Sequence, residues 1–249
     1  MDKRKYKVGS VSYLNARPLI YGFEKGMMKD EIDLLIDYPS AIAAQLISGQ
    51  IDIGLVPVAV IPQLPEAHII ADYCIGCDGE VATVCLFSEV LLHEISSILL
   101  DYQSRTSVAL LKLLLKEHWH ISPELIDAKP GYENDIGGKV AGLVIGDRAF
   151  DMHRKSAYSY DLGQAWKEMT GMPFVFAAWV SNKRVEANFA EQFNRSIAFG
   201  FDNLDEVIST IESADVDMRK YFTENLSYGL DDTKRKALDL FLAKLTAGK

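Results

Sequence analysis

Short apolar segments alternate with amphipathic ones through the first third of the chain. Runs of β-branched and aliphatic residues predict strands at Lys7–Ser12, Glu31–Asp37, Ile51–Val56 and Val81–Phe87. Pro18 suits the first turn of a helix that runs toward Gly26. Pro39-Ser40 opens a second helix, Ala41–Ser48, which Gly49 stops. The pattern therefore predicts strands and helices in alternation.

The alternation continues in the second part of the chain. Ile95–Leu100, Ala141–Asp147 and Pro173–Ser181 are predicted strands, a helix is predicted from Val108 to about Trp119, and the remainder after residue 181 is mostly helical. This order indicates βαβ units and a largely parallel sheet. Ligands in such sheets bind at the carboxyl ends of strands beside helix N-termini. The turns to inspect are those at 12–17, 39–40, 57–59 and 104–107.

Composition and charge exclude several classes of protein. The 249 residues are 49% hydrophobic and 24% charged, which is typical of a globular chain. The net charge of −9 argues against a nucleic-acid partner. No apolar run approaches a membrane span, and Gly9, Ser10 and Ser12 interrupt the one apolar segment near the N-terminus. We therefore expect a cytoplasmic protein with no membrane insertion.

The three cysteines predict no disulfide framework, because their number is odd. Cys74 and Cys77 have a C-x-x-C spacing, but no second pair follows to complete a zinc site. The turn Asp78-Gly79 comes directly after them, where a redox motif would begin a helix. We expect neither a metal nor another cofactor.

Ser104-Arg105-Thr106-Ser107 precedes the strongest predicted helix. Hydroxyl groups and free backbone N–H groups at a helix start can bind a carboxylate, helped by the positive end of the helix dipole. A simple N-cap would use the same residue types. The motif by itself leaves both interpretations open.

Two further polar residues follow predicted strands. Asn15, beside Arg17, carries an amide that donates and accepts hydrogen bonds without ionising, and it is equally suited to a turn. Asp147 ends the strand that includes Gly146. Its carboxylate can serve as a general base or cap the helix expected near Arg148.

Blocks of residues along nearly the whole chain resemble the chorismate dehydratases of menaquinone biosynthesis. They are Ser12-Tyr13-Leu14-Asn15-Ala16-Arg17-Pro18-Leu19, Gly76-Cys77-Asp78-Gly79, Ser104-Arg105-Thr106-Ser107, Ile145-Gly146-Asp147, Tyr160-Asp161-Leu162-Gly163, Trp166-Lys167, Thr170-Gly171, Pro173–Trp179 and Tyr221-Phe222. The resemblance implies an α/β fold like that of type II periplasmic binding proteins. In that fold two α/β lobes are joined by two crossing strands around a central cleft. We expect residues 1–87 and 174–249 in one lobe and 88–173 in the other.

The resemblance also implies a reaction of the futalosine pathway. Chorismate loses water to give 3-[(1-carboxyvinyl)oxy]benzoate, a carbon–oxygen lyase reaction without metal or cofactor. Asn15 and Asp147 are the expected catalytic residues. Either the enolpyruvyl carboxylate of the substrate, oriented by Asn15, or Asp147 takes the proton. The expected substrate-binding residues are Ser12, Arg17, Ser40, Thr83, Ser104, Arg105, Thr106 and Ser107.

Other functions stay open at this level. The sister enzyme 1,4-dihydroxy-6-naphthoate synthase has the same fold, and so does a non-catalytic solute-binding protein. The motifs at 12–19 and 104–107 favour the dehydratase. The expected partner is a small anionic substrate, and a homodimer is allowed.

Overall fold

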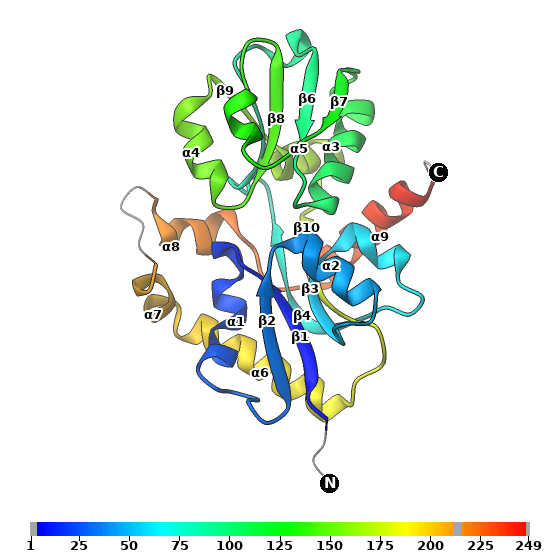
Figure 1. Ribbon diagram of the computed structural model, residues 1–249, viewed down its shortest axis with the longest axis vertical. Coiled ribbons are helices and arrows are strands. Elements are labelled where there is room, and N and C mark those ends of the chain that lie inside the picture. The colour runs from blue at the N-terminus through cyan, green and yellow to red at the C-terminus, as the bar shows by residue number, and fades with distance from the viewer. Residues whose placement is uncertain (1–3, 212–215, 248–249) are drawn as a thin grey trace.

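The computed structural model describes residues 4–211 and 216–247, and within them the chain forms two α/β lobes (Figure 1). The strands are β1 (Tyr6–Val11), β2 (Ile32–Asp37), β3 (Ile53–Pro57), β4 (His68–Cys77), β5 (Val84–Ser88), β6 (Ser97–Leu100), β7 (Glu124–Asp127), β8 (Val140–Ile145), β9 (Tyr158–Asp161) and β10 (Phe174–Ser181). One five-stranded sheet has the order β2-β1-β3-β10-β4, and the other has the order β7-β6-β8-β5-β9. Each lobe thus has its own sheet.

Both sheets are mixed, whereas the alternating pattern indicates a largely parallel sheet. In each order the first three strands run parallel. The fourth, β10 or β5, runs antiparallel to both neighbours. These are the strands by which the chain enters one lobe from the other, and they enter in the reverse direction.

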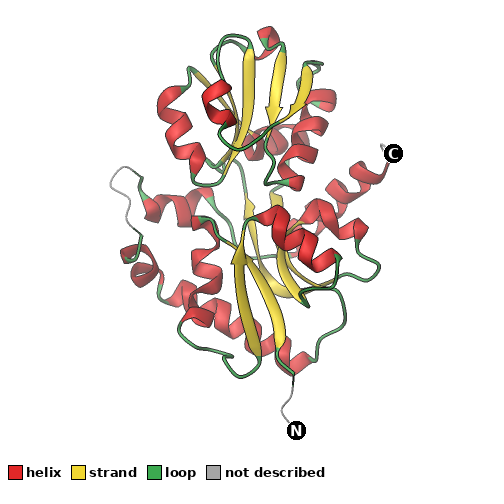
Figure 2. Ribbon diagram, viewed as in Figure 1, coloured by secondary structure: helices red, strands yellow, loops and turns green. Residues whose placement is uncertain are grey.

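Helices cover the sheets in both lobes (Figure 2). The helices are α1 (Arg17–Glu24), α2 (Pro39–Ile47), α3 (Arg105–Glu117), α4 (Arg148–Lys155), α5 (Leu162–Thr170), α6 (Ala187–Asp202), α7 (Leu204–Ser209), α8 (Met218–Lys220) and α9 (Asp232–Ala247). Shorter 3₁₀ turns lie at Leu14–Ala16, Val58–Gln63, Leu92–Glu94 and Tyr132–Asp135, and a π-helical turn at Tyr221–Asn225. No helix in the described residues is long and apolar enough to cross a membrane.

The first crossing between the lobes lies earlier than expected. Val84–Ser88 pairs with β8 and β9 of the second sheet, so the chain crosses between Cys77 and Val84 and not near residue 87. The strand expected from Val81 begins three residues later because Ala82 has a φ of 66°. The backbone N–H groups of Val81 and Ala82 donate to the Asp161 carboxylate, at 3.0 and 2.8 Å.

Most predicted strands are present with shifts of a few residues at their ends, but three strands were not anticipated. β4 is buried along most of its length and shows no alternation. β7 is exposed throughout, and β9 is a four-residue strand at the edge of its sheet. None of the three carries the pattern of a half-buried strand.

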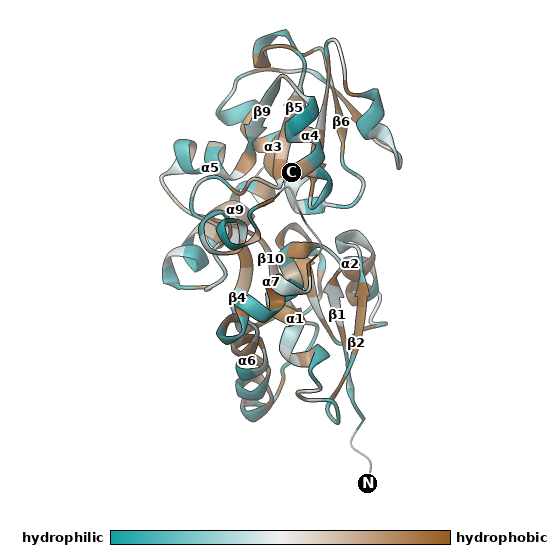
Figure 3. Ribbon diagram, turned by 90° about the vertical axis from the view of Figure 1, so that its left-hand side faces the viewer, coloured by the Kyte–Doolittle hydropathy of each residue, from teal (hydrophilic) through white to brown (hydrophobic). Residues whose placement is uncertain are grey.

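Aromatic side chains join the layers of the core. Trp179 of β10 is fully buried and packs against Phe23 of α1 and Phe193 of α6, with ring centroids 6.2 and 5.0 Å apart. Trp166 of α5 packs against Phe241 of α9 at 5.9 Å, which couples the two lobes. In Figure 3 hydrophobic residues gather on β4 and β10, while α6 and α9 carry hydrophilic residues outward. The larger cluster of buried hydrophobic residues extends through both lobes, and a second, smaller cluster lies in the second lobe.

Candidate active site

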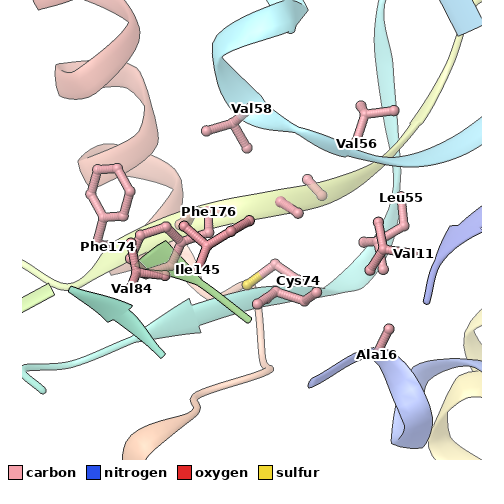
Figure 4. Close-up of a cluster of buried hydrophobic side chains, with 14 of the residues drawn as sticks. Val11, Ala16, Leu55, Val56, Val58, Cys74, Val84, Ile145, Phe174 and Phe176 are labelled. Atoms are coloured by element: carbon pink, nitrogen blue, oxygen red, sulfur yellow. The ribbon is translucent and has the colours of Figure 1, made fainter. Parts of the chain in front are cut away.

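A cavity lies between the lobes. Apolar side chains from both sheets form its walls, among them Val11, Val84, Ile145 and Phe176 (Figure 4). Its lining residues are Val11, Tyr13, Asn15, Pro39, Pro57, Ile75, Val81, Val84, Ser104, Ser107, Ile145, Gly146, Phe176 and Ala177. A mostly apolar cavity with a few converging polar groups is typical of a site for a small molecule.

Asn15 is one of these polar groups and lies on the 3₁₀ turn Leu14–Ala16 that follows β1. The Tyr228 hydroxyl donates to the Asn15 carbonyl oxygen at 2.9 Å, which fixes the turn. The side-chain oxygen, Oδ1, is buried and has no hydrogen-bond partner in the protein. A buried acceptor without a partner is energetically unfavourable, so this atom is suited to a ligand that donates a hydrogen bond.

Thr83 lies behind the wall of the cavity. Its hydroxyl is fully buried and forms a 2.8 Å hydrogen bond with the hydroxyl of Tyr221. Burial raises the pKa of Tyr221, so this side chain stays neutral. Thr83 is not among the lining residues, and its hydroxyl is used within the protein.

The N-terminus of α3 forms a second polar end of the cavity, from the second lobe, whereas Asn15 belongs to the first lobe. Ser104 is the N-cap, where its oxygen accepts from the backbone N–H of Ser107 at 3.1 Å and its hydroxyl donates to Ser107 Oγ at 2.8 Å. Both serines line the cavity. The first turn of a helix leaves backbone N–H groups without intrahelical acceptors, and these favour an anion.

Thr106 and Arg105, from the same motif, make contacts outside the cavity. The Thr106 hydroxyl oxygen accepts from the backbone N–H of Ala59 at 3.1 Å, a contact between the lobes. Arg105 is exposed and donates to the Gln63 side chain at 3.4 Å. Neither lines the cavity.

Asp147 occupies the position before α4 but does not cap it. Its carboxylate accepts from the backbone N–H of Leu14 in the other lobe, at 3.1 and 3.3 Å. Burial raises the pKa of this carboxyl to about 6. Gly146 lines the cavity, whereas Asp147 does not. The carboxylate is thus placed to join the lobes next to Asn15.

The remaining predicted site residues lie outside the cavity lining. Ser12 is exposed. The guanidinium of Arg17 forms an ion pair with Glu24 at 3.7 Å and donates to Thr210 at 3.5 Å. Ser40 lines an adjacent groove that also includes Ser104.

Sequence reasoning missed the groups that hold Tyr13 across the cleft. The Tyr13 hydroxyl donates to Gln103, and Arg148 donates to the same amide at 3.2 Å. Arg148 also pairs at 2.6 Å with Asp101, whose side chain is fully buried. Burial raises the pKa of that carboxyl, while Arg148 opposes the rise. No local pattern marks these residues, because their partners come from different segments.

The cysteines are buried and reduced, in keeping with their odd number. Burial raises the pKa of the Cys74 thiol to about 12, which leaves it protonated at neutral pH and a poor nucleophile. Among the described residues no group of His, Cys, Asp and Glu side chains is arranged to hold a metal ion.

Comparison with solved structures identifies the fold. A protein from Archaeoglobus fulgidus superposes with a TM-score of 0.77 at 16% identity, covering 98% of this chain and 97% of that one. A Candida albicans protein described as having the generic periplasmic binding protein fold superposes with a TM-score of 0.61 at 12% identity, covering 98% and 91%. The two lobes and two crossings agree with the fold expected from the sequence.

Comparison of sequences identifies the family. The chain is 28% identical over 200 residues to the chorismate dehydratase of Thermus thermophilus, covering 71% of this chain and 69% of the relative. It is 25% identical over 242 residues to that of Campylobacter jejuni, covering 94% and 95%. The family model for menaquinone biosynthesis matches residues 6–247. The chain therefore belongs to the menaquinone biosynthesis family.

Proposed function

We propose that this protein is a chorismate dehydratase, which converts chorismate to 3-[(1-carboxyvinyl)oxy]benzoate and water. Its relatives in Thermus thermophilus and Campylobacter jejuni carry that name. The observation that carries the proposal is the buried, unpartnered Oδ1 of Asn15 in a cavity whose other polar end is the N-terminus of α3. Such a cavity suits a ligand with an anionic group at the α3 end and a hydrogen-bond donor at the Asn15 end.

The α3 end is suited to the ring carboxylate. The proton that leaves the ring is vinylogous to this carboxylate, so its removal pushes negative charge into the carboxylate oxygens. Donors that are already in place stabilise such charge by about 3–4 kcal/mol each. Ser107 and the first N–H groups of α3 are the donors in this proposal.

We place the enolpyruvyl carboxylate at the Asn15 end and propose that it is the base. One oxygen of this carboxylate takes the proton from the ring carbon that bears the ether, and the C–H electron pair moves into the ring. The new carboxylic acid O–H then needs an acceptor, and Asn15 Oδ1 supplies one. An acceptor that favours the neutral acid raises the proton affinity of the carboxylate.

The second step releases water. The bond between the ring and the neighbouring hydroxyl breaks, and the ring becomes aromatic. The departing hydroxide takes the proton held by the carboxylic acid and leaves as water, which restores the carboxylate. Asp147 is the rival base, but its carboxylate accepts from Leu14 and lies outside the cavity lining. We propose for it a role in joining the lobes.

The test is direct. Purified protein is mixed with chorismate alone, and the products are followed by chromatography and mass spectrometry. A new aromatic product lighter by one water supports the proposal. Unchanged chorismate with folded protein overturns it. Turnover of the substrate of 1,4-dihydroxy-6-naphthoate synthase, or binding without turnover, would identify the alternative function.

Two further properties belong to this proposal. We propose that the enzyme acts in the cytoplasm, and that a homodimer is compatible with its activity. Cell fractionation and light scattering in solution test these two predictions separately from the reaction.

A further inference from the structure

The first crossing between the lobes passes through a strained residue. Ala82 has a φ of 66°, in the left-handed region that is unfavourable for a residue with a Cβ. Val81 and Val84, which flank it in the chain, both line the cavity. The Thr83 carbonyl oxygen accepts from the backbone N–H of Gly146 at 2.9 Å, so the segment also meets the opposite wall. Strain of this kind persists only where surrounding groups hold it.

Asp161 holds the strained residue at its N–H group. The Oδ2 atom of Asp161 accepts from the backbone N–H groups of Val81 and Ala82, at 3.0 and 2.8 Å. The Oδ1 atom accepts from the backbone N–H of Gln164 at 3.0 Å, which makes Asp161 the N-cap of α5. A helix cap needs only one side-chain oxygen. The second oxygen of this carboxylate therefore serves the crossing segment.

His153 of α4 holds the same residue at its carbonyl group. The Nε2 atom of His153 lies 2.7 Å from the Ala82 carbonyl oxygen. Because a carbonyl oxygen only accepts, Nε2 carries a proton and donates it to this bond. The imidazole packs edge-on against Phe87 of β5, with ring centroids 4.9 Å apart. Ala82 is thus fixed on both sides by residues from distant segments of the chain.

The start of α5 also packs directly on the crossing segment. A Cβ at Gly163 would lie 2.5 Å from Cys77 Sγ and 2.6 Å from the carbonyl oxygen of Gly79. Lys167, one turn further along α5, forms an ion pair with Asp78. The path of the chain after Cys77 is therefore set by contacts with α5 as well as by the two hydrogen-bonding side chains.

We propose that Asp161 and His153 are positioning residues that hold Ala82 in its left-handed conformation. They thereby fix Val81 and Val84 in the wall of the cavity. The inference rests on the proposed function, because this wall encloses the substrate of that reaction. Neither Asp161 nor His153 lines the cavity, so their effect on turnover passes through the wall. Without these hydrogen bonds Ala82 relaxes toward a negative φ and both valines move, and a small misplacement of a substrate is costly for turnover.

Steady-state kinetics with chorismate on Asp161→Ser test this role. Serine keeps one oxygen to cap α5, but this oxygen is one bond closer to the backbone and cannot also serve Val81 and Ala82. We expect kcat to fall about 10-fold while KM changes less than about 3-fold. Asp231→Ser is the matched control, because Asp231 is exposed and accepts from the backbone N–H of Lys234, three residues further on, at 2.8 Å. The control should leave kcat unchanged.

Ala82→Gly separates positioning from a general loss of structure. Glycine adopts a positive φ without strain, so it needs no hydrogen bonds to hold it there. Ala82→Gly alone should change kcat less than about 2-fold, and in its background Asp161→Ser should lower kcat less than about 3-fold. A 10-fold loss in both backgrounds would overturn the inference, because Asp161 would then act by another route. Unchanged kcat in Asp161→Ser would overturn it as well.

His153→Phe provides a second cycle of the same design. The variant keeps a ring against Phe87 and removes the donor to Ala82, so kcat should fall about 3-fold in the unaltered chain and stay unchanged in the Ala82→Gly background. This cycle decides if Asp161→Ser does not fold, and thermal melting of each variant reports its folding. Equal losses in both backgrounds would contradict the proposed role. Absence of chorismate turnover by the unaltered protein would instead refute the proposed function.

Discussion

The two polar ends of the cavity are built in different ways. The α3 end consists of consecutive residues, Ser104 to Ser107, on the first turn of one helix. At the Asn15 end, the hydrogen bond that fixes the turn joins Asn15 to Tyr228, which is 213 residues away in the chain. A single helix start suffices to direct N–H groups at an anion. A single acceptor needs partners from several segments to hold it.

The difference has an energetic consequence. Backbone N–H groups at a helix start are oriented by the helix itself, so the loss of one side chain leaves most donors in place. At the Asn15 end each hydroxyl has a defined partner, and its removal leaves a buried polar group unsatisfied at a cost of about 1–3 kcal/mol. We therefore expect the Asn15 end to be the more sensitive to substitution.

The largest expected effect comes from Asn15→Ala. Removing the acceptor should lower kcat by about 10²–10³-fold, similar to the loss of one donor from an oxyanion site. KM should change much less, because the α3 end still binds the ring carboxylate. Asn188→Ala, an exposed asparagine on α6, is the control and should leave both constants unchanged. Full turnover by Asn15→Ala would show that the Asn15 end has no role in the reaction.

Tyr13 packs against Gly146 in a contact between the lobes beside Asn15, and a substitution at Gly146 can break this contact. Gly146 has a φ of 65°, and a Cβ there would lie 2.6 Å from the Tyr13 ring. Gly138 has a φ of 55° and open space around it. Both Ala variants carry backbone strain, but Gly146→Ala should lose about 1–3 kcal/mol more and raise KM.

Chemical unfolding and steady-state kinetics of the two glycine variants measure that difference. Equal losses of stability in Gly146→Ala and Gly138→Ala, with equal KM values, would contradict a packed contact between Tyr13 and Gly146. In that case the loss of stability in both glycine variants would come from backbone strain alone.

Asp147→Asn tests the burial of this carboxyl through the pH dependence of stability. Burial raises the pKa of Asp147 in the folded protein to about 6, from an ordinary value of 3.8. The folded state therefore binds this proton more tightly than the unfolded state, and the contribution of Asp147 to stability falls as pH rises from about 4 through 6. The variant does not titrate, so its stability relative to the unaltered protein should rise by about 1–2 kcal/mol over that range, allowing for partial exposure.

The same variant decides between the two bases. With the substrate's carboxylate as base, Asp147→Asn keeps measurable kcat and the acid limb of its pH profile. Unfolding curves at pH 4 and pH 7, together with the kcat profile, are the measurements. Loss of a bell-shaped profile in the variant would make Asp147 the base.

The smallest expected effect is at the α3 end. Ser104→Ala removes the N-cap and should lower stability by about 1 kcal/mol. It should raise KM about 3-fold and change kcat little, because the backbone N–H groups remain. Ser104→Thr keeps the cap and should behave almost as the unaltered protein. If Ser104→Ala lost as much kcat as Asn15→Ala does, the two ends would not differ in their sensitivity to substitution.

Much of the fold could be predicted from local pattern. Lys7–Ser12 and Pro173–Ser181 were correctly expected as strands, since both are apolar and bounded by turn residues. The helix after Ser104 was expected to begin at Val108 and begins at Arg105, where the cap places it. β4 escaped prediction because both of its faces are covered and no alternation remains.

The structure brings only some of the predicted site residues to the cavity. Asn15, Ser104 and Ser107 line the cavity, whereas Arg17 and Ser40 do not. A residue type suited to anions does not reveal which way its side chain points once the chain is folded. Arg17 lies about two turns from Glu24 on its own helix and pairs with it there.

What the sequence by itself determined is the set of local groups, namely the hydroxyl-rich start of α3, the neutral amide after β1 and the order of strands and helices. The tertiary structure decided which of these groups meet. It alone brought Tyr228 to Asn15 and Tyr221 to Thr83, turned Asp147 toward Leu14, and left Asn15 Oδ1 without a partner. The physical reason is that helix caps and strands depend on near neighbours, whereas the partner of a buried polar group is set by packing across the whole chain.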